Sequence, residues 1–359
     1  MSKNICQYLD GFFPPPKYLQ MKSVGVDISD SSARFVVFED QVKGLRIKDF
    51  GTEVIPPGAI SGGIINDKKA VSDVLAKIKA KTTFDFISLS LPEERAYLFK
   101  MQVPKVRDEE IREAISFRIE ENVPVPLKEA VFDYSIIGSE EGSDHIDVVV
   151  SLVPFKLSDT YSEVAINAGF QPLRFEISSQ AVAKAVTPFG DKRTFLIMNF
   201  GELKTGFSIV NKGNVFFSST VSVGSSTSNM IIAQKFKVDS TKVDKIKDDI
   251  LGSGKQNMSL FMEIMNELDP LKEEIVKLIT YWKTHSASLM GTSSPIEKII
   301  LCGKDTILPA VDEYISGVSG IKTEVANVWR NVFSLEDYIP PINYKDSLDY
   351  AGAVGLTIN

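Results

Sequence analysis

The sequence is poor in the residues that build disulfide frameworks, zinc sites and histidine-based catalytic centres. It has two cysteines and two histidines among 359 residues. Cys6 and Cys302 lie far apart without a partner motif, so a disulfide framework is not expected and a reducing cytoplasm is the simplest setting. No spacing of His, Cys and carboxylates resembles a zinc site, and His145 and His285 are the only candidate bases for a Ser-His-Asp hydrolase. Both histidines are therefore interpreted as surface or structural residues.

Long apolar runs and an excess of basic charge are also missing. No segment approaches the roughly 20 apolar residues of a membrane-spanning helix. Residues 1–22 show neither the apolar stretch nor the small-residue cleavage site of a secretory signal. We therefore expect membrane contact through a partner or a surface segment. The net charge of −7 argues against nucleic-acid binding, because affinity for phosphate backbones rests on clustered Lys and Arg.

The chain is long enough for two domains or a pair of lobes rather than one compact core. Its N-terminal arm (residues 1–22) places Phe12 and Phe13 before three consecutive prolines, which favour an extended path. Two interpretations stay open for this arm. It packs its phenylalanines onto the body of the protein, or it docks onto a partner or a membrane surface.

Two strand-rich stretches frame a module of mixed character. Strand patterns from Val24, an amphipathic helix at 66–80 and a buried strand open the first stretch. The order β-α-β-β-α between about 95 and 170 indicates an inserted subdomain, and strands resume near residue 195. We divide the chain into the N-terminal arm (1–22), a first lobe (23–94), an inserted α+β subdomain (95–172), a return to the first lobe (173–193), a second lobe (194–345) and a C-terminal helix that returns to the first lobe (346–359).

A weak internal repeat relates the beginnings of the two lobes. VGVDISDSSARFVVF and FLIMNFGELKTGFSIV each show an apolar strand, a polar turn and a second apolar strand, with Asp27 aligned to Asn199. This pattern favours duplicated lobes that each begin with a β-hairpin, against the alternative of a chance match between two hairpins.

The hairpin turns carry residues suited to phosphate and magnesium. A turn of glycines and hydroxyl side chains exposes N–H groups that can hold phosphate oxygens. A carboxylate beside it can hold Mg²⁺, usually through waters that the ion retains. A buried carboxylate needs a cation, donors or solvent, which is why Asp27 is the candidate metal-binding residue. In the alternative interpretation, Asp27 and Ser29 only close a tight turn.

The sequence resembles the actin/Hsp70-type ATPase superfamily and, within it, the PilM family of type IV pilus assembly proteins. GVDISDSSARFV resembles the first phosphate loop, and IILCGKDTILPAVDEYI resembles the adenosine loop with its helix. More specific is ISFRIEENVPVPLKEAVFDYSII, in which a helix rich in Glu and Arg runs into a proline break and then a strand. The resemblance implies an actin-like two-lobed α/β fold of duplicated RNase H-like domains with an inserted α+β subdomain.

The resemblance also implies a cleft between the lobes that holds ATP and Mg²⁺. Asp27, Glu176 and Asn199 would be the catalytic residues, with Glu176 where the superfamily places an acid that orients the attacking water. The other matched positions would bind the nucleotide: Ser29, Ser31 and Ser32 on the first phosphate loop, Gly201, Lys204 and Thr205 on the second, Glu274 and Lys277 on the helix beside the base and ribose, and Gly303, Lys304 and Asp305 on the adenosine loop.

Three departures from the family pattern predict weak or lost hydrolysis. Asn199 stands where the second loop ordinarily begins with Asp, which removes a negative charge from the Mg²⁺ site. Hydrogen bonds to charged groups are worth roughly 1.5–3 kcal/mol, so metal affinity and alignment should both weaken. Ser29 stands where glycine is common, and Gly303 is the one glycine left of the adenosine cluster.

The leading functional hypothesis is a cytoplasmic scaffold, peripheral at the inner face of the cytoplasmic membrane, for a type IV pilus or related secretion machine. It would dock the N-terminal tail of a PilN-like membrane protein along the inserted subdomain and contact other pilus assembly proteins. The alternatives are an active Mg-ATPase that drives assembly and a filament-forming relative like FtsA. FtsA-like chains usually finish with an amphipathic membrane helix, whereas this sequence stops at LTIN. Homo-oligomer formation stays open.

Overall fold

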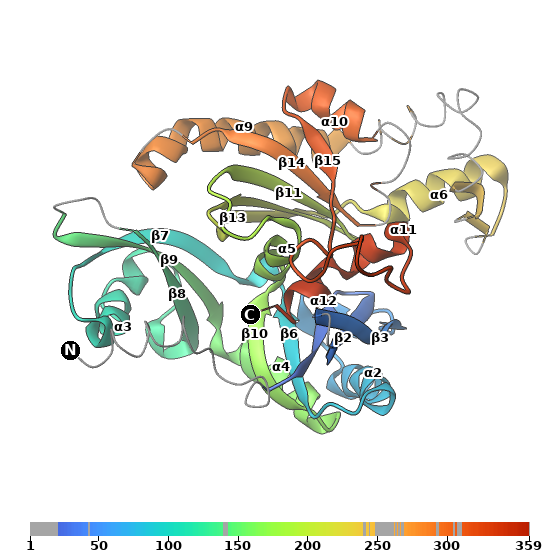
Figure 1. Ribbon diagram of the computed structural model, residues 1–359, viewed down its shortest axis with the longest axis horizontal. Coiled ribbons are helices and arrows are strands. Elements are labelled where there is room, and N and C mark those ends of the chain that lie inside the picture. Colours follow the sequence, from blue (N-terminus) through green and yellow to red (C-terminus); the bar gives the residue numbers. More distant parts are fainter. Residues whose placement is uncertain are drawn as a thin grey trace.

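The computed structural model describes most of the chain between residues 21 and 358. The described residues are 21–41, 44–138, 143–239, 242–243, 245–247, 262, 264, 266, 269–291, 294–303, 306 and 311–358. Almost all of the N-terminal arm lies outside them, so neither interpretation of the arm is tested. Figure 1 shows two lobes stacked on each other, with a third module projecting from the side of the first.

The first lobe is built on a mixed five-stranded sheet in the order β10-β6-β1-β2-β3. Strands β1, β2 and β3 form an antiparallel meander, and β6 and β10 add to it in parallel. A polar turn follows β1, and β10 is an edge strand with which no described strand pairs on its outer side. The strand bounds are β1 Ser23–Ile28, β2 Ser32–Gln41, β3 Gly44–Val54, β6 Phe86–Leu91 and β10 Gln171–Ile177.

The second lobe repeats this topology strand for strand. Its sheet has the order β13-β12-β11-β14-β15, again with an antiparallel meander followed by two parallel strands. The bounds are β11 Thr194–Phe200, β12 Thr205–Asn211, β13 Asn214–Val221, β14 Ile296–Cys302 and β15 Thr323–Val325. The repeat expected from the two hairpins is therefore a duplication of a whole sheet, and β1 and β11 hold equivalent positions.

Helices cover the second sheet and line its core. Helix α9 (Asp269–Met290) buries Leu271, Ile275, Leu278 and Trp282 at helical spacing in the core of this lobe, and α10 (Val311–Ser319) packs beside it. Helices α6 (Ser225–Phe236) and the short α11 (Tyr344–Ser347) also belong to this half. Among the described residues, none of the helices combines the length and the apolar character that crossing a membrane would require.

The inserted subdomain is a three-stranded antiparallel sheet in the order β7-β9-β8. Its strands are β7 Tyr97–Pro104, β8 Ala130–Gly138 and β9 His145–Pro154, and helix α3 (Asp108–Ser116) covers one face. The helix that was expected to run into the proline break at Pro124 ends earlier, at Ser116. A 3-10 turn at Ile119–Glu121 follows it and places Ile119 in the same core as Ile111 and Ile115. Strand β8 is an edge strand, and no described strand pairs with its outer side.

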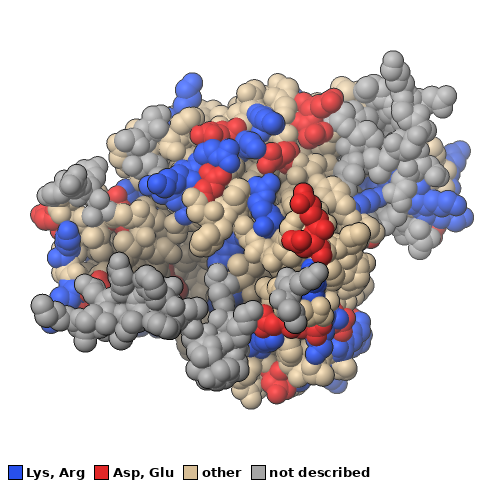
Figure 2. Space-filling view, in the orientation of Figure 1, with Lys and Arg blue, Asp and Glu red and all other residues tan. Residues whose placement is uncertain are grey.

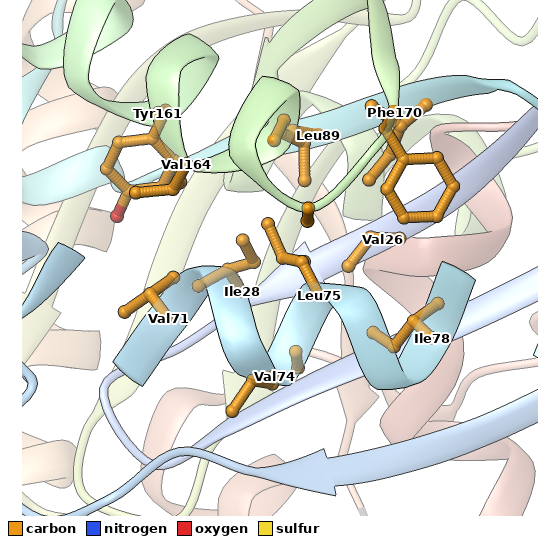
Figure 3. Packing of buried hydrophobic residues seen from close by; sticks show 14 of the residues in the cluster. Val26, Ile28, Val71, Val74, Leu75, Ile78, Leu89, Tyr161, Val164 and Phe170 are labelled. Atoms are coloured by element: carbon orange, nitrogen blue, oxygen red, sulfur yellow. The ribbon is translucent and has the colours of Figure 1, made fainter. Parts of the chain in front are cut away.

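Helix α4 (Phe155–Asn167) belongs by packing to the first lobe, although the sequence analysis placed it in the insertion. Its buried face of Tyr161, Val164 and Ala165 meets the apolar stripe of α2 (Lys68–Lys81) above strands β1 and β6. Figure 3 shows this contact, with Tyr161 and Val164 facing Val71 and Leu75. The i, i+3, i+4 spacing of apolar residues on both helices explains why they pair.

A shared core joins the lobes. Helix α5 (Ser178–Val186) and the C-terminal helix α12 (Ala351–Gly355) pack in a cluster with residues of β2, β11 and β14. The two helices touch closely, since a Cβ placed on Gly355 would lie 1.7 Å from the carbonyl oxygen of Ala181. Figure 1 shows the C-terminal end of the chain between the two lobes, near β10 and α12.

Candidate functional site: the inter-lobe cavity and the insertion groove

The polar turn after β1 is closed by its own serines. The Ser29 N–H donates to the Ser32 carbonyl at 2.8 Å, and the Ser32 N–H donates to Ser29 Oγ at 3.1 Å. Ser29 and Ser32 therefore direct their polar groups into the turn. This geometry agrees with the turn-closing interpretation of Ser29 and leaves Ser31 to face the other lobe. The Asp30 carboxylate accepts the N–H groups of Gly62 (2.9 Å) and Gly63 (3.0 Å) within the first lobe.

The turns of the two lobes are in direct contact. Ser31 Oγ donates to Glu202 Oε2 at 2.8 Å. The Lys204 ammonium is bonded to Glu94 and lies 3.5 Å from Asp30 Oδ1. These contacts form a latch between the lobes, consisting of Asp30, Ser31, Glu94, Glu202 and Lys204.

The space beneath this latch is small. We call it the inter-lobe cavity, and it encloses about 90 Å³. Sites for small ligands and cofactors typically enclose about 300–1,000 Å³. The residues around the cavity therefore do not fit a nucleotide at the present separation of the lobes. The lining residues are Asp27, Ile28, Ser29, Asp30, Ser31, Arg34, Gly63, Pro92, Glu93, Glu94, Ser178, Asn199, Phe200, Gly201, Glu202, Leu203, Lys204, Gly206 and Asp349.

The negative charge of the inter-lobe cavity also disfavours binding of a triphosphate without a metal ion. Its carboxylic acids outnumber its two cations, Arg34 and Lys204. Burial raises the pKa of Asp27, although hydrogen bonds and the nearby Arg34 act in the other direction. Burial, and after it the adjacent Glu94, raises the pKa of Glu93 to about 8, so this carboxyl is mostly protonated at neutral pH. Within the part of the chain that the structure describes, no three metal-binding side chains converge as a ready metal site.

Asp27 and Asn199 lie in the same cavity, as the sequence analysis expected. Asp27 is near the end of β1, where its Oδ1 accepts a long hydrogen bond (3.5 Å) from Ser178. Its carboxylate packs against the backbone of α12, since a Cβ on Gly352 would lie 2.4 Å from Asp27 Oδ2. Asn199 is in the second-last position of β11. Asp27 and Asn199 thus hold equivalent positions, each the second-last residue of its strand and one from each lobe.

The other second-loop residues have structural partners. Gly201 donates its N–H to the Lys204 carbonyl at 2.9 Å, which closes the β11–β12 turn. The Thr205 side chain is buried, and its hydroxyl donates to the Val223 carbonyl at 2.7 Å. Of the residues expected on this loop, Lys204 therefore presents its side chain to the opposite lobe, and Thr205 does not.

The residues expected around the base lie away from the cavity. Glu274 accepts hydrogen bonds from Ser219 Oγ (2.7 Å) and Lys277 Nζ (3.0 Å), all within the second lobe. Gly303 has a left-handed backbone (φ +92°) and packs against Phe200. A Cβ placed on Gly303 would lie 2.1 Å from the Phe200 carbonyl oxygen. Lys304 and Asp305 lie outside the described residues.

Glu176 does not reach the inter-lobe cavity. It belongs to β10, and its carboxylate pairs with Arg174 Nε (2.9 Å) and Lys184 Nζ (2.8 Å). Two residues later, Ser178 begins α5 and does line the cavity.

Two acids of the cavity, Glu93 and Glu94, were not predicted from the sequence. They follow Pro92 directly after the buried strand β6, which runs parallel to β1. Because parallel strands end at the same edge of a sheet, acids after β6 are brought next to Asp27. A search for polar residues at the carboxyl ends of the parallel strands would have found them.

A second and larger concavity lies between the inserted subdomain and the first lobe. We call it the insertion groove, and it encloses about 400 Å³. Both of its long walls carry edge strands, β8 on one side and β10 on the other. It is lined by Leu91, Val131, Phe132, Asp133, Tyr134, Ser135, Ser151, Val153, Ser158, Arg174, Phe175, Glu176, Ile177, Gln180, Lys184, Gly213, Asn214 and Val215.

Several polar side chains of the insertion groove form hydrogen bonds across it or along its walls. Gln180 Nε2 of α5 donates to Ser151 Oγ of β9 at 2.7 Å, which ties the two walls together at the base. On β8, the Asp133 carboxylate accepts the Tyr134 N–H at 2.9 Å, and Arg112 donates to the Phe132 carbonyl at 2.9 Å. The groove therefore combines apolar wall residues with a few placed polar groups, as is typical of binding sites.

Comparisons with known proteins agree with this architecture. A family model described as type IV pilus assembly protein PilM matches residues 25–359. The solved PilM–PilN type IV pilus biogenesis complex is 18% identical over 94% of this chain and 97% of that chain, with a TM-score of 0.73. No curated protein matches the sequence.

Two other solved structures share the fold at lower similarity. The ethanolamine utilization protein EutJ from Carboxydothermus hydrogenoformans is 14% identical over 96% of this chain and 90% of that chain, with a TM-score of 0.52. MreB5 of Spiroplasma citri bound to AMPPNP is 13% identical over 94% and 95%, with a TM-score of 0.50. The expected actin-like fold is confirmed, with its two mixed sheets.

Proposed function

Because this chain belongs to the PilM family of type IV pilus assembly proteins, we propose that it is a cytoplasmic scaffold that docks the N-terminal tail of a PilN-like inner-membrane protein. The observation that carries the proposal is the insertion groove, an open concavity of about 400 Å³ between two edge strands. A similar solved structure is a PilM–PilN complex, which supports a partner of this kind. The membrane is then reached through the partner.

The tail would lie in the groove as an extended segment. An extended peptide binds an edge strand through main-chain hydrogen bonds, and its alternate side chains enter pockets. Arg112 and Asp133 already bond the Phe132 carbonyl and the Tyr134 N–H of β8. Pairing along β8 would displace these side chains, so β10 is the better edge for the tail, which would still lie against the inserted subdomain.

Nucleotide binding would be a secondary property that needs the lobes to separate. The AMPPNP-bound MreB5 shares the fold, and this supports nucleotide binding by a more open form. The small acidic cavity and Asn199 at the equivalent of Asp27 favour weak or absent hydrolysis over an active ATPase. If the lobes open, Asp27 and Asn199 would supply oxygen acceptors for Mg²⁺-bound waters, and the ion would offset the negative charge of the phosphates.

Nucleic acid is not part of the proposed function. On the face drawn in Figure 2, the coloured Lys and Arg side chains alternate with Asp and Glu, and no basic patch dominates among them. A phosphate-backbone binder would need such a patch.

The experiment uses a labelled synthetic peptide with the N-terminal sequence that precedes the membrane span of a PilN-like protein. The full chain should bind it with saturable affinity. Asp133→Arg places a long cation on the groove wall and should weaken binding at least tenfold. Asp73→Arg makes the same charge change on the exposed face of α2 and should leave binding unchanged. Absence of binding to the unmodified chain, with and without Mg-ATP, would refute the proposal.

A further inference from the structure

The Glu176 carboxylate is a buried acceptor that uses only one of its two oxygens. The side chain is 10% exposed and lines the insertion groove. Both of its cationic partners, Arg174 and Lys184, approach Oε1. Oε2 is buried and has no hydrogen-bond partner within the described part of the chain. Buried polar atoms nearly always have partners, so an unpaired carboxylate oxygen on a groove wall points to a donor supplied by a ligand.

The charges around Glu176 select an uncharged donor. Arg174 and Lys184 already neutralise the carboxylate and leave an excess of one positive charge at this end of the groove. A Lys or Arg side chain of a ligand would meet these two cations at close range and be repelled. A peptide N–H carries no net charge, and an extended segment offers one at nearly every residue.

We propose that Glu176 Oε2 accepts a backbone N–H of the docked tail and that Glu176 is therefore a peptide-binding residue of the insertion groove. This inference rests on the proposed function, since the tail is the occupant. Glu176 is itself on β10, so a segment paired along that edge passes beside the side chain. The carboxylate would add a side-chain acceptor to the main-chain hydrogen bonds of the added strand.

The substitution Glu176→Gln tests this role with little change in shape. The amide oxygen of Gln would turn toward Arg174 and Lys184, because both are donors. Its NH₂ group would then occupy the place of Oε2 and face the peptide N–H, donor against donor. Glu163→Gln is the matched control: it removes the same charge from the exposed face of α4, where Glu163 pairs with Lys68 outside the groove.

Fluorescence anisotropy with the tail peptide should show binding to Glu176→Gln about 10- to 100-fold weaker than to the unmodified chain. Binding to Glu163→Gln should stay within twofold. A series of peptides, each N-methylated at one residue, provides a second measurement on the unmodified chain. Methylation at one position should weaken binding to the unmodified chain by a similar factor. For Glu176→Gln, that methylated peptide should bind almost as well as the unmethylated peptide, because the hydrogen bond is already lost.

The outcomes separate this inference from the proposed function. Equal or tighter binding by Glu176→Gln, or an N-methyl series without a position coupled to residue 176, overturns the role of Glu176 and leaves tail docking intact. Tighter binding would mean that the peptide presents an acceptor, such as a carbonyl oxygen, to residue 176 instead of an N–H. Absence of peptide binding to the unmodified chain overturns both. If Glu176→Gln does not fold, as judged by its melting curve, the N-methyl series alone decides.

Discussion

Ser31 and Glu202 are joined by a 2.8 Å hydrogen bond that crosses from the first lobe to the second. Its donor lies in the turn after β1, and its acceptor lies in the equivalent turn after β11. With the Lys204 ion pairs beside it, this bond holds the two polar turns against each other over a cavity of about 90 Å³. In this structure the two turns contact each other, whereas a nucleotide cleft would need them to be apart.

Glu202→Ala should loosen this contact. It removes the Ser31 acceptor and one acidic side chain of the cavity, and a hydrogen bond of this kind is worth about 0.5–1.5 kcal/mol. Amide hydrogen exchange in residues 29–32 should become faster by up to about tenfold, and calorimetry should show tighter binding of Mg-ATP. Glu273→Ala, on the exposed face of α9, is the control. Unchanged exchange in the turn would mean that the hydrogen bond does not hold the lobes together.

Glu93 should make stability fall with rising pH. Its carboxyl has a pKa of about 8 in the folded protein, against an ordinary value of 4.5. Between these values the folded state holds a proton that the unfolded state has lost, so the free energy of unfolding decreases from about pH 4.5 to 8. Glu93→Gln should remove this part of the decrease and be the more stable protein at pH 8. Urea denaturation of both proteins at pH 5, 6, 7 and 8 measures the difference, and parallel curves would argue against a buried, protonated Glu93.

Asn199→Asp should make the protein depend on Mg²⁺. A second carboxylate beside Asp27 adds an acid to a cavity that already has an excess of them, so the melting temperature without Mg²⁺ should drop. Millimolar Mg²⁺ should restore it, because the ion gains a charged ligand. Phosphate release from ATP should rise several-fold in the same variant. A melting temperature indifferent to Mg²⁺ would show that residues 27 and 199 do not share an ion.

Gly355→Ala should destabilise the join between α12 and α5. The added methyl group would overlap the Ala181 carbonyl, and overpacking of this kind costs about 1–3 kcal/mol. Gly317→Ala makes the same change in α10, where no atom lies within 4 Å of the new Cβ, and should stabilise by about 0.4–1 kcal/mol. Thermal unfolding of the two variants should therefore shift in opposite directions. Equal shifts would show that the close approach of α12 is not required.

The paired lobes could be predicted because they rest on local patterns. Alternating apolar residues and polar turns specify hairpins, and the same pattern at Asp27 and Asn199 indicates a duplicated sheet. Glu176 was expected in the inter-lobe cleft because a motif match gives only a position in the sequence, whereas the point at which β10 ends and α5 begins decides which residue lies beside the cavity. Ser178 reaches the inter-lobe cavity, and Glu176 faces the groove. Helix α4 was assigned to the insertion because it follows the insertion's last strand in the sequence. Its apolar face packs on α2, and periodicity alone does not specify such a long-range contact.

The size of the cavity was beyond sequence reasoning for a similar reason. The side chains of Asp30, Ser31, Glu202 and Lys204 are ordinary for exposed turns, and each turn alone predicts an open phosphate loop. Their contacts depend on the angle between two lobes, which the packing of α5 and α12 in the shared core determines.

Hydrogen exchange of the full chain with and without the tail peptide tests tail docking most directly. The account predicts slower exchange in β10 (Gln171–Ile177) and in β8 (Ala130–Gly138), with little change in the turn at residues 29–32. Protection confined to the second lobe or to the inter-lobe turns, with β8 and β10 unchanged, would contradict it.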